Sequence, residues 1–339
     1  MDLPKVDVSP KELYGMSFAA IQSKLLFSAI ELKIFNHLAE PRTAEQVADA
    51  IGGHPGNTVF FLNGLVACGL VTKKNGVYRN TPVSQTFLVE GSPTSLRRVF
   101  IHQAAMMEKK FANLSKMVLN GPPDPDSDHG AGSEKEWASH ATWMANNQRA
   151  GVAQQMACVV ADLPEFSSFR KMLDLGGGPG IFGIAMVKRH PSMKGVVFDR
   201  KAVVDIAQNF IDEYELKDRM TVLAGDYNKD PIGEGYDLIW ASATLNFAQK
   251  NMDTVMKKIY DALNPQGLFI NLSEGLTHEG TQPDIWAIHA VGWAMSNPMK
   301  PFEQGFITDA MLKAGFKQVR SRTLHTDWRP MDLDIARKS

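Results

Sequence analysis

The chain contains little cysteine and has almost no net charge. Its only cysteines are Cys68 and Cys158, which excludes a disulfide framework and favours a reducing compartment. The 36 basic residues are balanced by 37 acidic ones, without a long block of one sign, so binding to nucleic acid through phosphate neutralisation is not expected. The N-terminus lacks the apolar run of a signal peptide, and no stretch approaches the roughly 18 apolar residues of a membrane span. We therefore predict a cytoplasmic protein that binds neither nucleic acid nor membranes.

The sequence also lacks metal-ligand spacing among its His, Cys and carboxylate residues, so no metal site is predicted. Its length of 339 residues exceeds what one hydrophobic core usually supports. We expect two domains, with the boundary near Asp162. Residues 1–162 show helical patterns, whereas strands and helices alternate over 163–339, as in an α/β domain with a mostly parallel sheet.

The first domain is predicted to be mainly helical and to contain a winged helix. A helical pattern over about 10–38 carries apolar residues on more than one face, which requires burial on several sides, for example against a partner subunit. A capping box at Thr43–Gln46, a helix over about 57–68 and a hairpin around Asn75-Gly76 follow in the order of a winged helix. The 57–68 helix contains neither Lys nor Arg, so it is unsuited to reading DNA.

A glycine-rich stretch organises the second domain. Residues 171–180 read KMLDLGGGPG and lead into the apolar run 181–187. Glycines let a strand turn sharply into a helix while the backbone comes close to a ligand, and the N–H groups at the helix start favour an anionic group. Three interpretations fit: G-x-G-x-x-G over 178–183, which is typical of NAD(P) sites, Asp-x-Gly-x-Gly-x-Gly over 174–180, and a tight turn without a ligand.

Acidic residues close the strands that begin with the glycine-rich unit. Asp199 ends the second predicted strand, where an acid can accept both ribose hydroxyls, and Asp226 follows the third. Because the carboxyl ends of parallel strands meet at one sheet edge, these acids and Asp174 are expected to converge on a nucleoside-containing cofactor. The predicted strands lie near 171–175, 195–199, 220–224, 236–240, 268–272, 316–323 and 332–337, and the intervening helices near 181–190, 201–213 and 250–263.

Together these features resemble the small-molecule O-methyltransferases, a family that includes the plant caffeate and hydroxyindole enzymes. The resemblance rests on Leu173–Gly180, Val197–Asp199, Gly225–Tyr227 and the ALNPQG run at 262–267, preceded by a winged-helix domain, and it covers nearly the whole chain. It implies a Rossmann-like domain with a mostly parallel seven-stranded sheet, which binds S-adenosylmethionine (SAM) and releases S-adenosylhomocysteine (SAH). It also implies a homodimer formed through the N-terminal domain.

The resemblance further implies roles for individual residues. Asp174 would help to hold the amino acid end of SAM, and Asp226 would hold the adenine amino group, with Tyr227 packed on the ring. Met144 and Gln148 fall where family members place a methionine and a polar residue near SAM. The predicted cofactor-binding residues are Asp174, Gly176, Gly178, Gly180, Asp199, Asp226, Tyr227, Trp240, Met144, Gln148 and Arg149.

The sequence departs from the family where the catalytic base is expected. Family members carry Leu-His-Asp-Trp after the fourth strand, and the histidine takes the proton of the acceptor hydroxyl. Here the residues are Thr244–Phe247, with Leu245 at the histidine position. Three explanations remain. Another residue acts as the base, or the acceptor ionises without help, or the methyl group goes to carbon, nitrogen or sulfur. Proximity and orientation can supply roughly 7–11 kcal/mol of the barrier, so methyl transfer itself does not depend on this histidine.

Two helical stripes carry candidate replacement bases. His289 shares a helix face with Trp286 and Trp293, and His140 shares one with Trp137. Either face would provide an apolar aromatic wall with one imidazole, suited to a flat aromatic acceptor, although both stripes would also serve to pack the domains together. The candidate catalytic residues are His289, His140 and Glu274, which is close to where the family places a supporting acid. The predicted pocket residues are Trp286, Trp293, Trp137, Met106, His102 and Leu245.

The sequence therefore predicts a homodimeric SAM-dependent methyltransferase that acts on a small aromatic or heteroaromatic molecule, with a hydroxyl oxygen favoured as the acceptor. Three alternatives stay open. The first is C-, N- or S-methylation without a general base, and the second is an NAD(P)-dependent oxidoreductase. The third is a protein that binds SAM without catalysis.

Overall fold

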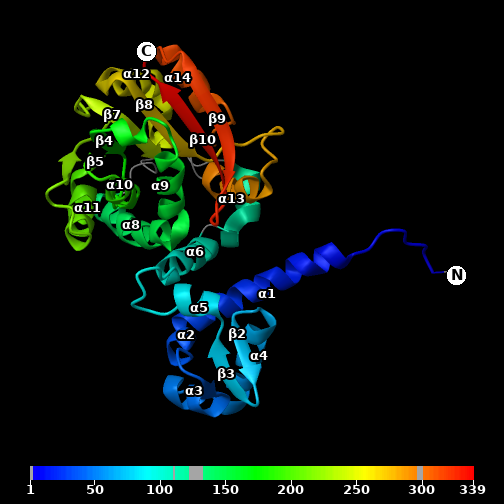
Figure 1. Ribbon diagram of the computed structural model, residues 1–339. Coiled ribbons are helices and arrows are strands. Elements are labelled where there is room, and N and C mark those ends of the chain that lie inside the picture. The colour runs from blue at the N-terminus through cyan, green and yellow to red at the C-terminus, as the bar shows by residue number, and fades with distance from the viewer. Residues whose placement is uncertain (1–2, 110, 122–132, 296–300) are drawn as a thin grey trace. The chain divides into compact units, whose positions relative to one another are not determined.

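A computed structural model describes residues 3–109, 111–121, 133–295 and 301–339, apart from the side chain of Trp293 (Figure 1). The chain divides into two units, one ending at Glu108 and the other beginning at Lys109. This division precedes the boundary predicted near Asp162. The reason is that helices α8 (Glu134–Asn147) and α9 (Ala153–Ala161) pack against helices of the second unit, α11 (Lys201–Glu213) and α10 (Ile181–Arg189) respectively.

The first unit combines helices with a small antiparallel sheet in the order β1-β3-β2. The predicted capping box is present, because Thr43 Oγ1 accepts the Gln46 N–H and the Gln46 side chain accepts the Thr43 N–H. The predicted hairpin is confirmed as well, with Asn75 and Gly76 at positive φ between its strands. The elements are α1 (Lys11–Glu31), α2 (Ile34–His37), β1 (Arg42–Thr43), α3 (Ala44–Ile51), α4 (Pro55–Ala67), β2 (Val71–Lys74), β3 (Val77–Asn80), α5 (Pro82–Phe87) and α6 (Arg97–Lys109).

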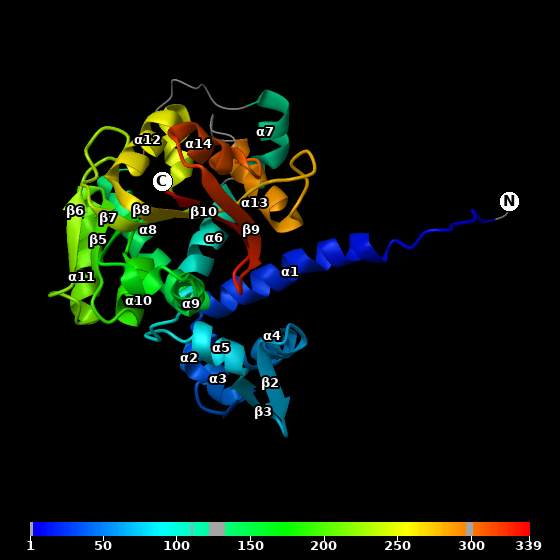
Figure 2. The same cartoon turned by 45° about the horizontal axis from the view of Figure 1, so that its top comes forward.

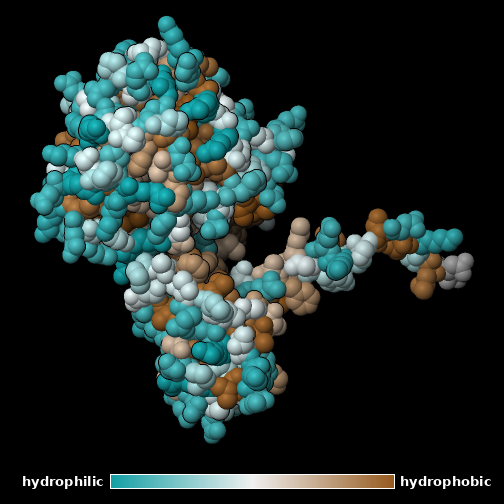
Figure 3. All heavy atoms as spheres, viewed as in Figure 1, coloured by the Kyte–Doolittle hydropathy of each residue, from teal (hydrophilic) through white to brown (hydrophobic). Residues whose placement is uncertain are grey.

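Helix α1 is apolar on several faces, as predicted, but only its C-terminal end is buried within the unit. Ala29 and Ile30 belong to the core, whereas Met16 and Phe18 are 74% and 61% exposed, and Figure 3 shows hydrophobic atoms recurring along the helix. Contrary to the sequence-based expectation, α1 is long and apolar enough to cross a membrane by length and composition. Exposed apolar surface of this kind usually marks a site of contact with another protein or with a membrane.

The second unit is built on a seven-stranded sheet in the order β6-β5-β4-β7-β8-β10-β9. The first five strands in this order are parallel, and β10 runs antiparallel to both β8 and β9. This confirms the predicted Rossmann-like domain. The strands are β4 (Lys171–Leu175), β5 (Lys194–Asp199), β6 (Met220–Ala224), β7 (Tyr236–Ser242), β8 (Leu263–Ser273), β9 (Gln318–His325) and β10 (Pro330–Arg337).

Helices cover both faces of this sheet (Figure 2). One core joins the sheet to α9, α10 and α11, and the other joins it to α12 and α14. Neighbouring residues of a strand therefore enter different cores, as Leu173 and Met172 of β4 do, which explains the continuous apolar runs of the central strands. The remaining helices are η1 (Phe111–Asn113), α7 (Leu114–Asn120), η2 (Gln148–Val152), η3 (Phe166–Ser168), η4 (Leu245–Asn251), α12 (Met252–Ala262), α13 (Asp284–Ala294) and α14 (Phe306–Ala314).

Candidate active site

The glycine-rich loop between β4 and α10 is folded tightly around Asp174. This carboxylate is only 1% exposed and accepts a 2.9 Å hydrogen bond from the Gly183 N–H in the first turn of α10. A Cβ atom added to Gly177 would lie 2.7 Å from Asp174 Cγ, and one added to Gly183 would lie 2.9 Å from Asp174 Oδ2. Glycine is therefore required at these two positions because the acid fills the space.

Burial sets the charge state of this acid. It raises the pKa of Asp174 to about 7, against the hydrogen bond from Gly183, which lowers it, while the negative charge of Asp199 adds to the rise. The buried Asp174 side chain thus supports the glycine-rich loop by packing against Gly177 and Gly183. Its predicted contact with the amino acid end of a ligand stays a prediction.

Gly176, Gly178 and Gly180 all have φ near +60 to +75°, a region that L side chains rarely adopt. A Cβ atom on Gly176 would lie 2.1 Å from Thr244 Oγ1, and one on Gly180 would lie 3.0 Å from Val197. At Gly178, in contrast, a Cβ atom would meet nothing within 4 Å. Side chains therefore fill the space beside Gly176 and Gly180, whereas the loop is open at Gly178, where no atom of the described residues fills that space.

Asp199, at the end of β5, is hydrogen-bonded to the glycine-rich loop at Gly178, where the loop is open. Its Oδ2 accepts the Gly178 N–H at 2.8 Å, and its Oδ1 accepts the Arg200 N–H at 2.7 Å. Burial raises the pKa of Asp199, although these hydrogen bonds and the Arg200 charge oppose the rise. The two neighbouring strand ends, β4 and β5, are thereby joined at one edge of the sheet.

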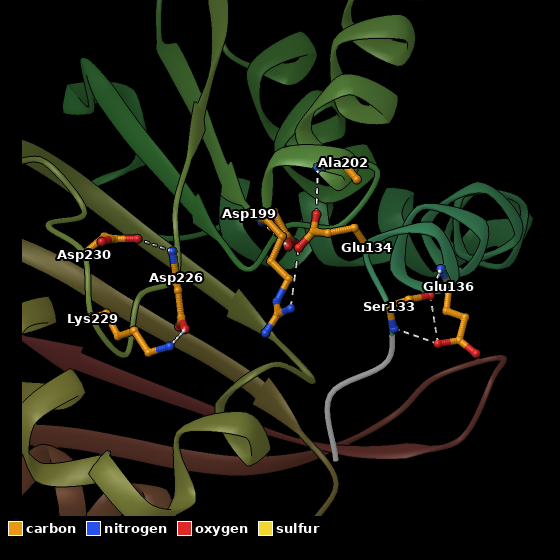
Figure 4. Close-up of polar contacts among 9 residues, drawn as sticks. Ser133, Glu134, Glu136, Asp199, Ala202, Asp226, Lys229 and Asp230 are labelled. Carbon is orange, nitrogen blue, oxygen red and sulfur yellow. Dashed lines mark hydrogen bonds and ion pairs between the residues drawn. The ribbon is translucent and has the colours of Figure 1, made fainter. Parts of the chain in front are cut away.

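Helix α8 is tied to the same edge (Figure 4). Glu134 Oε2 accepts the Ala202 N–H at 3.1 Å, in the first turn of α11, and Glu134 Oε1 lies 3.6 Å from Arg200 Nη1. A carboxylate at a helix N-terminus is favoured by the helix dipole. The Arg200 guanidinium in turn lies 5.8 Å from the ring centre of Trp137.

Asp226 and Tyr227 follow β6 and differ in their surroundings. Asp226 Oδ1 accepts the Asn228 N–H at 3.0 Å, and its Oδ2 lies 3.7 Å from Lys229 Nζ. Burial alone would raise the pKa of Asp226, but these hydrogen bonds and the Lys229 charge lower it, so this carboxylate is ionised near neutral pH. Tyr227 is 8% exposed, and its hydroxyl donates to the Thr244 carbonyl at 2.6 Å.

Three other predicted cofactor residues, Trp240, Arg149 and Gln148, differ in their packing and hydrogen bonding. Trp240 is completely buried, packs its ring against Phe182 with 5.5 Å between ring centres, and lies opposite Asp174 in the β4–β7 pairing, so its contact with the cofactor stays a prediction. The Arg149 guanidinium is occupied by Glu213 at 3.0 Å and Asn146 at 2.7 Å, which makes it a brace between η2 and α11. Gln148 is also buried.

The Oε1 atom of Gln148 has no hydrogen-bond partner within the described ranges. A buried carbonyl oxygen without a donor is costly to leave unsatisfied. Its position one residue after α8 therefore fits the predicted polar contact with a ligand. Met144 lies one helical turn earlier on α8 and is half-buried.

Aromatic rings gather around the two predicted bases. The His140 ring lies between Trp137 and Trp143, with centre distances of 5.9 and 5.7 Å, and the Trp137 ring meets Phe247 at 5.1 Å. Phe247 belongs to the segment after β7 that holds Leu245. Burial lowers the pKa of His140, while the Glu136 charge opposes the shift.

The second predicted base belongs to a cluster that sequence reasoning recognised only in part. The His289 ring lies 5.5 Å from that of Trp286, and Trp286 in turn lies 6.0 Å from Trp328, measured between ring centres. The Arg329 guanidinium lies over both indoles, 4.8 Å from Trp286 and 5.3 Å from Trp328. We call His289, Trp286, Trp328 and Arg329 the arginine–indole cluster.

Electrostatic coupling places Glu274 near this cluster. Burial raises the pKa of Glu274, and the positive charge of Arg329 opposes that rise. Burial also lowers the pKa of His289, and the Arg329 charge lowers it further. The His289 imidazole is therefore neutral at pH 7 and has a nitrogen lone pair that can accept a proton.

Comparisons with known proteins decide the family. A model described as an O-methyltransferase domain matches residues 111–287, and an O-methyltransferase dimerisation domain matches residues 14–90. The chain belongs to the O-methyltransferase family. It is a SAM-dependent methyltransferase.

Individual members of this O-methyltransferase family share about a quarter of the sequence. Acetylserotonin O-methyltransferase of Bos taurus is 26% identical over 88% of this chain and 90% of its own. The N,N-dimethyltransferase OxyT of Streptomyces rimosus is 27% identical over 77% of each chain. The structure of human N-acetylserotonin methyltransferase in complex with SAM superposes with a TM-score of 0.80 at 22% identity, covering 99% of this chain and 100% of the other.

The residues at the sheet edge of this methyltransferase fit SAM. The loop is open at Gly178, beside the carboxylate of Asp199, and Asp226 lies at the next strand end. The unpartnered Oε1 of Gln148 supplies a further buried acceptor. These oxygens match the hydroxyl, amino and ammonium donors of the cofactor.

Four predicted pocket residues remain. Leu245, the first residue of η4, is 1% exposed, packs in the core and cannot take a proton, and its part in the pocket stays a prediction. Met106 and His102 lie on α6 in the first unit, and their part in the pocket stays a prediction. The side chain of Trp293 lies outside the described part of the chain.

Sequence reasoning missed Trp328 and Arg329 of the methyltransferase. The signal was present, because Trp328-Arg329-Pro330 immediately precedes the predicted last strand, and that strand runs antiparallel to its neighbour. Its start therefore lies at the same edge as the carboxyl ends of the parallel strands.

Proposed function

We propose that this enzyme transfers the methyl group of SAM to the hydroxyl oxygen of a small aromatic or heteroaromatic acceptor. The observation that supports this most is the presence, within one unit, of a glycine loop that is open at Gly178 and hydrogen-bonded to Asp199, and of a neutral imidazole beside the indole of Trp286. SAM supplies an electrophilic methyl group. The protein residues hold donor and acceptor in line, exclude water and accept a proton.

We assign the proton acceptor to His289, with His140 as the competing candidate. Leu245 cannot act as a base, and both histidines are kept neutral at pH 7 by burial. His289 has in addition a fixed cation, Arg329, within electrostatic range, and Arg329 is itself coupled to the carboxyl group of Glu274. The carboxylate would offset the Arg329 charge, which disfavours the imidazolium that forms when the acceptor loses its proton.

One competing function has a specific observation in its favour. The base is missing from its usual position, and one relative, OxyT, is named an N,N-dimethyltransferase. An amine acceptor can be methylated through its free lone pair and then lose a proton to solvent. Incubating the purified enzyme with radiolabelled SAM and paired phenols and anilines of the same ring separates the two functions, because O-methylation predicts labelled methyl ethers and no labelled amines. A preference for anilines would overturn the proposal.

Asp199 is predicted to carry a large share of cofactor affinity. We expect Asp199→Asn to weaken SAM binding by about 10- to 100-fold, or roughly 1.4–2.8 kcal/mol, because the amide keeps one acceptor where the carboxylate serves two N–H groups and the ribose. Isothermal titration with SAM measures the change. Asp205→Asn, on the exposed face of α11 where Asp205 pairs with Lys201, should leave the affinity unchanged. Equal affinities for both variants would contradict the assignment.

We further propose a soluble, cytoplasmic homodimer formed through the N-terminal winged-helix unit. The dimerisation family model covers residues 14–90, and α1 leaves an apolar surface exposed within that range. A second copy is the occupant that this family model favours over a membrane. It would also supply the burial that a helix apolar on several faces requires.

Substituting two exposed residues of α1 should separate the subunits. We expect Met16→Ser with Phe18→Ser to convert a dimer into a monomer in light-scattering chromatography, because each serine removes buried apolar area from the interface. Leu312→Ser, on α14 and 49% exposed, is the matched control and should remain dimeric. Wild-type protein that is monomeric, or that floats with lipid vesicles, would exclude this dimer.

A further inference from the structure

We propose that Arg329 binds a carboxylate on the methyl acceptor, so that the substrates are hydroxylated aromatic or heteroaromatic carboxylic acids. This inference rests on the proposed function, because it assigns a chemical class to the acceptor of the same reaction. It is carried by the position of Arg329, the rigidity of its turn, its aromatic surroundings and its missing partner.

Arg329 stands at the functional edge of the sheet. It directly precedes β10, which is antiparallel to β8 with Asp332 opposite Ser273. Residue 329 therefore lies beyond the carboxyl end of β8, and β8 runs parallel to β7, β4 and β5. The glycine loop and Asp199 follow the carboxyl ends of β4 and β5, at that same edge.

The turn that carries Arg329 is fixed by one threonine. Thr326 Oγ1 accepts the N–H groups of Trp328 at 3.2 Å and Arg329 at 3.0 Å, and it donates to the Arg329 carbonyl at 2.7 Å. Trp286 is anchored to the following residue, since its Nε1 donates to the Pro330 carbonyl at 2.5 Å. The backbone that carries Arg329 and the Trp286 indole are thus held in place before any acceptor arrives, which lowers the entropic cost of binding.

The surroundings of Arg329 suit a planar anion. The guanidinium carbon lies over Trp286 and Trp328, whose ring planes meet at 85°. These cation–π contacts use no hydrogen bond, so the N–H groups stay available for an acceptor. A guanidinium edge presents parallel N–H donors to the two oxygens of a carboxylate. The neighbouring indoles supply apolar surface for the ring that bears this carboxylate.

The charge of Arg329 has no direct partner within the described residues. Its Nη1 is buried without a hydrogen bond, and Glu274 acts on it only through electrostatic coupling. The ionisable groups that couple to Arg329 are Glu274 and His289. A buried N–H of a cation without an acceptor is costly, and an acceptor carboxylate removes that cost. One arginine with an acid nearby favours a singly charged carboxylate over a doubly charged phosphate.

Binding to the SAH complex tests this inference without requiring turnover. The probes are hydroxylated benzoates, naphthoates and quinoline carboxylates, each titrated beside its carboxamide and the corresponding aryl phosphate. We expect the wild-type complex to bind at least one acid about 10-fold or more tightly than its carboxamide, and more tightly than the phosphate. Arg329→Gln should remove this preference while leaving carboxamide binding unchanged, and Arg329→Lys should restore part of it.

Two controls show that loss of preference reflects the site. Arg322→Gln changes an exposed arginine on the partner strand β9 and should keep the preference for acids. SAH affinity and melting temperature should be the same in all variants. Equal binding of acids and carboxamides by the wild-type complex, tighter binding of the phosphates, or a preference that survives in Arg329→Gln would overturn the inference. Methylation of neutral phenols with no preference for acids would overturn it and leave the proposed function intact, whereas acids that bind but are never methylated would contradict the proposed function alone.

Discussion

Replacing Gly176 by alanine is expected to abolish measurable SAM binding and to destabilise the second unit. The new methyl group would lie 2.1 Å from Thr244 Oγ1 and 2.8 Å from Thr244 Cβ, at a residue whose φ is +61°. Thr244 cannot move freely because it is buried and its carbonyl accepts the Tyr227 hydroxyl. A positive φ costs an alanine roughly 1–2 kcal/mol and overpacking roughly 1–3 kcal/mol, so we expect a loss of about 2–5 kcal/mol in the free energy of unfolding.

Gly178→Ala is the matched variant that separates affinity from stability. Its φ of +58° is similar, but the added Cβ atom would meet nothing within 4 Å. Only the conformational cost of roughly 1–2 kcal/mol should appear in the unfolding free energy. The affinity for SAM should nevertheless fall at least about 10-fold, because the methyl group would enter the space that the cofactor occupies.

A further glycine controls for backbone strain alone. Gly280 has φ +81° and equally open surroundings, but it lies in the loop after β8, remote in sequence from the glycine loop. Gly280→Ala should cost similar stability and leave SAM affinity unchanged. Gly178→Ala protein that binds SAM as the wild type does would contradict the placement of the cofactor over this loop.

Replacing His289 by glutamine is expected to lower the rate of methyl transfer by about 10²- to 10⁴-fold, the usual contribution of a general base. The pH profile gives the sharper signature. Because burial and then the Arg329 charge lower the pKa of His289 from its ordinary value of 6.5, the imidazole is neutral and competent above that pH. Activity should therefore fall only below pH 6.5, as the base becomes protonated, and this acid limb should disappear in His289→Gln.

The other candidate bases are tested beside it. His140→Gln should leave the acid limb in place and reduce the rate less. Glu274→Gln should lower the rate and shift the limb to lower pH, because the carboxylate that offsets the Arg329 charge beside His289 is removed. His278→Gln, in an exposed turn, should change neither quantity. A double variant of His289 and His140 with an unchanged rate at every pH would end the assignment of a histidine base.

The parts of the fold that sequence predicted well are those fixed by local patterns. The glycine loop, the acids at strand ends and the Asn75-Gly76 hairpin are each written within a few residues, and the chemistry of those residues admits few alternatives. The mostly parallel sheet follows from regular alternation of strands and helices. Asp174 at the loop was predicted for the same reason, although its complete burial beneath Gly177 and Gly183 was not.

The parts that sequence did not predict depend on contacts between distant residues. The domain boundary differs because α8 and α9 find their packing partners in α10 and α11, which come later in the chain. The arginine–indole cluster joins Trp286 to residues more than 40 positions later. The sequence could place Trp328 and Arg329 before a strand, but it could not show that they meet Trp286.

The central claim is that SAM lies across the carboxyl edge of the second unit, over Gly178 and between the carboxylates of Asp199 and Asp226. A crystal structure with SAH and an acceptor analogue measures this most directly. The account predicts the ribose hydroxyls on Asp199, the adenine amino group on Asp226, and the space beyond the sulfur bounded by His289 and Arg329. An adenosine bound away from Asp199, or a sulfur that faces neither histidine, would contradict it.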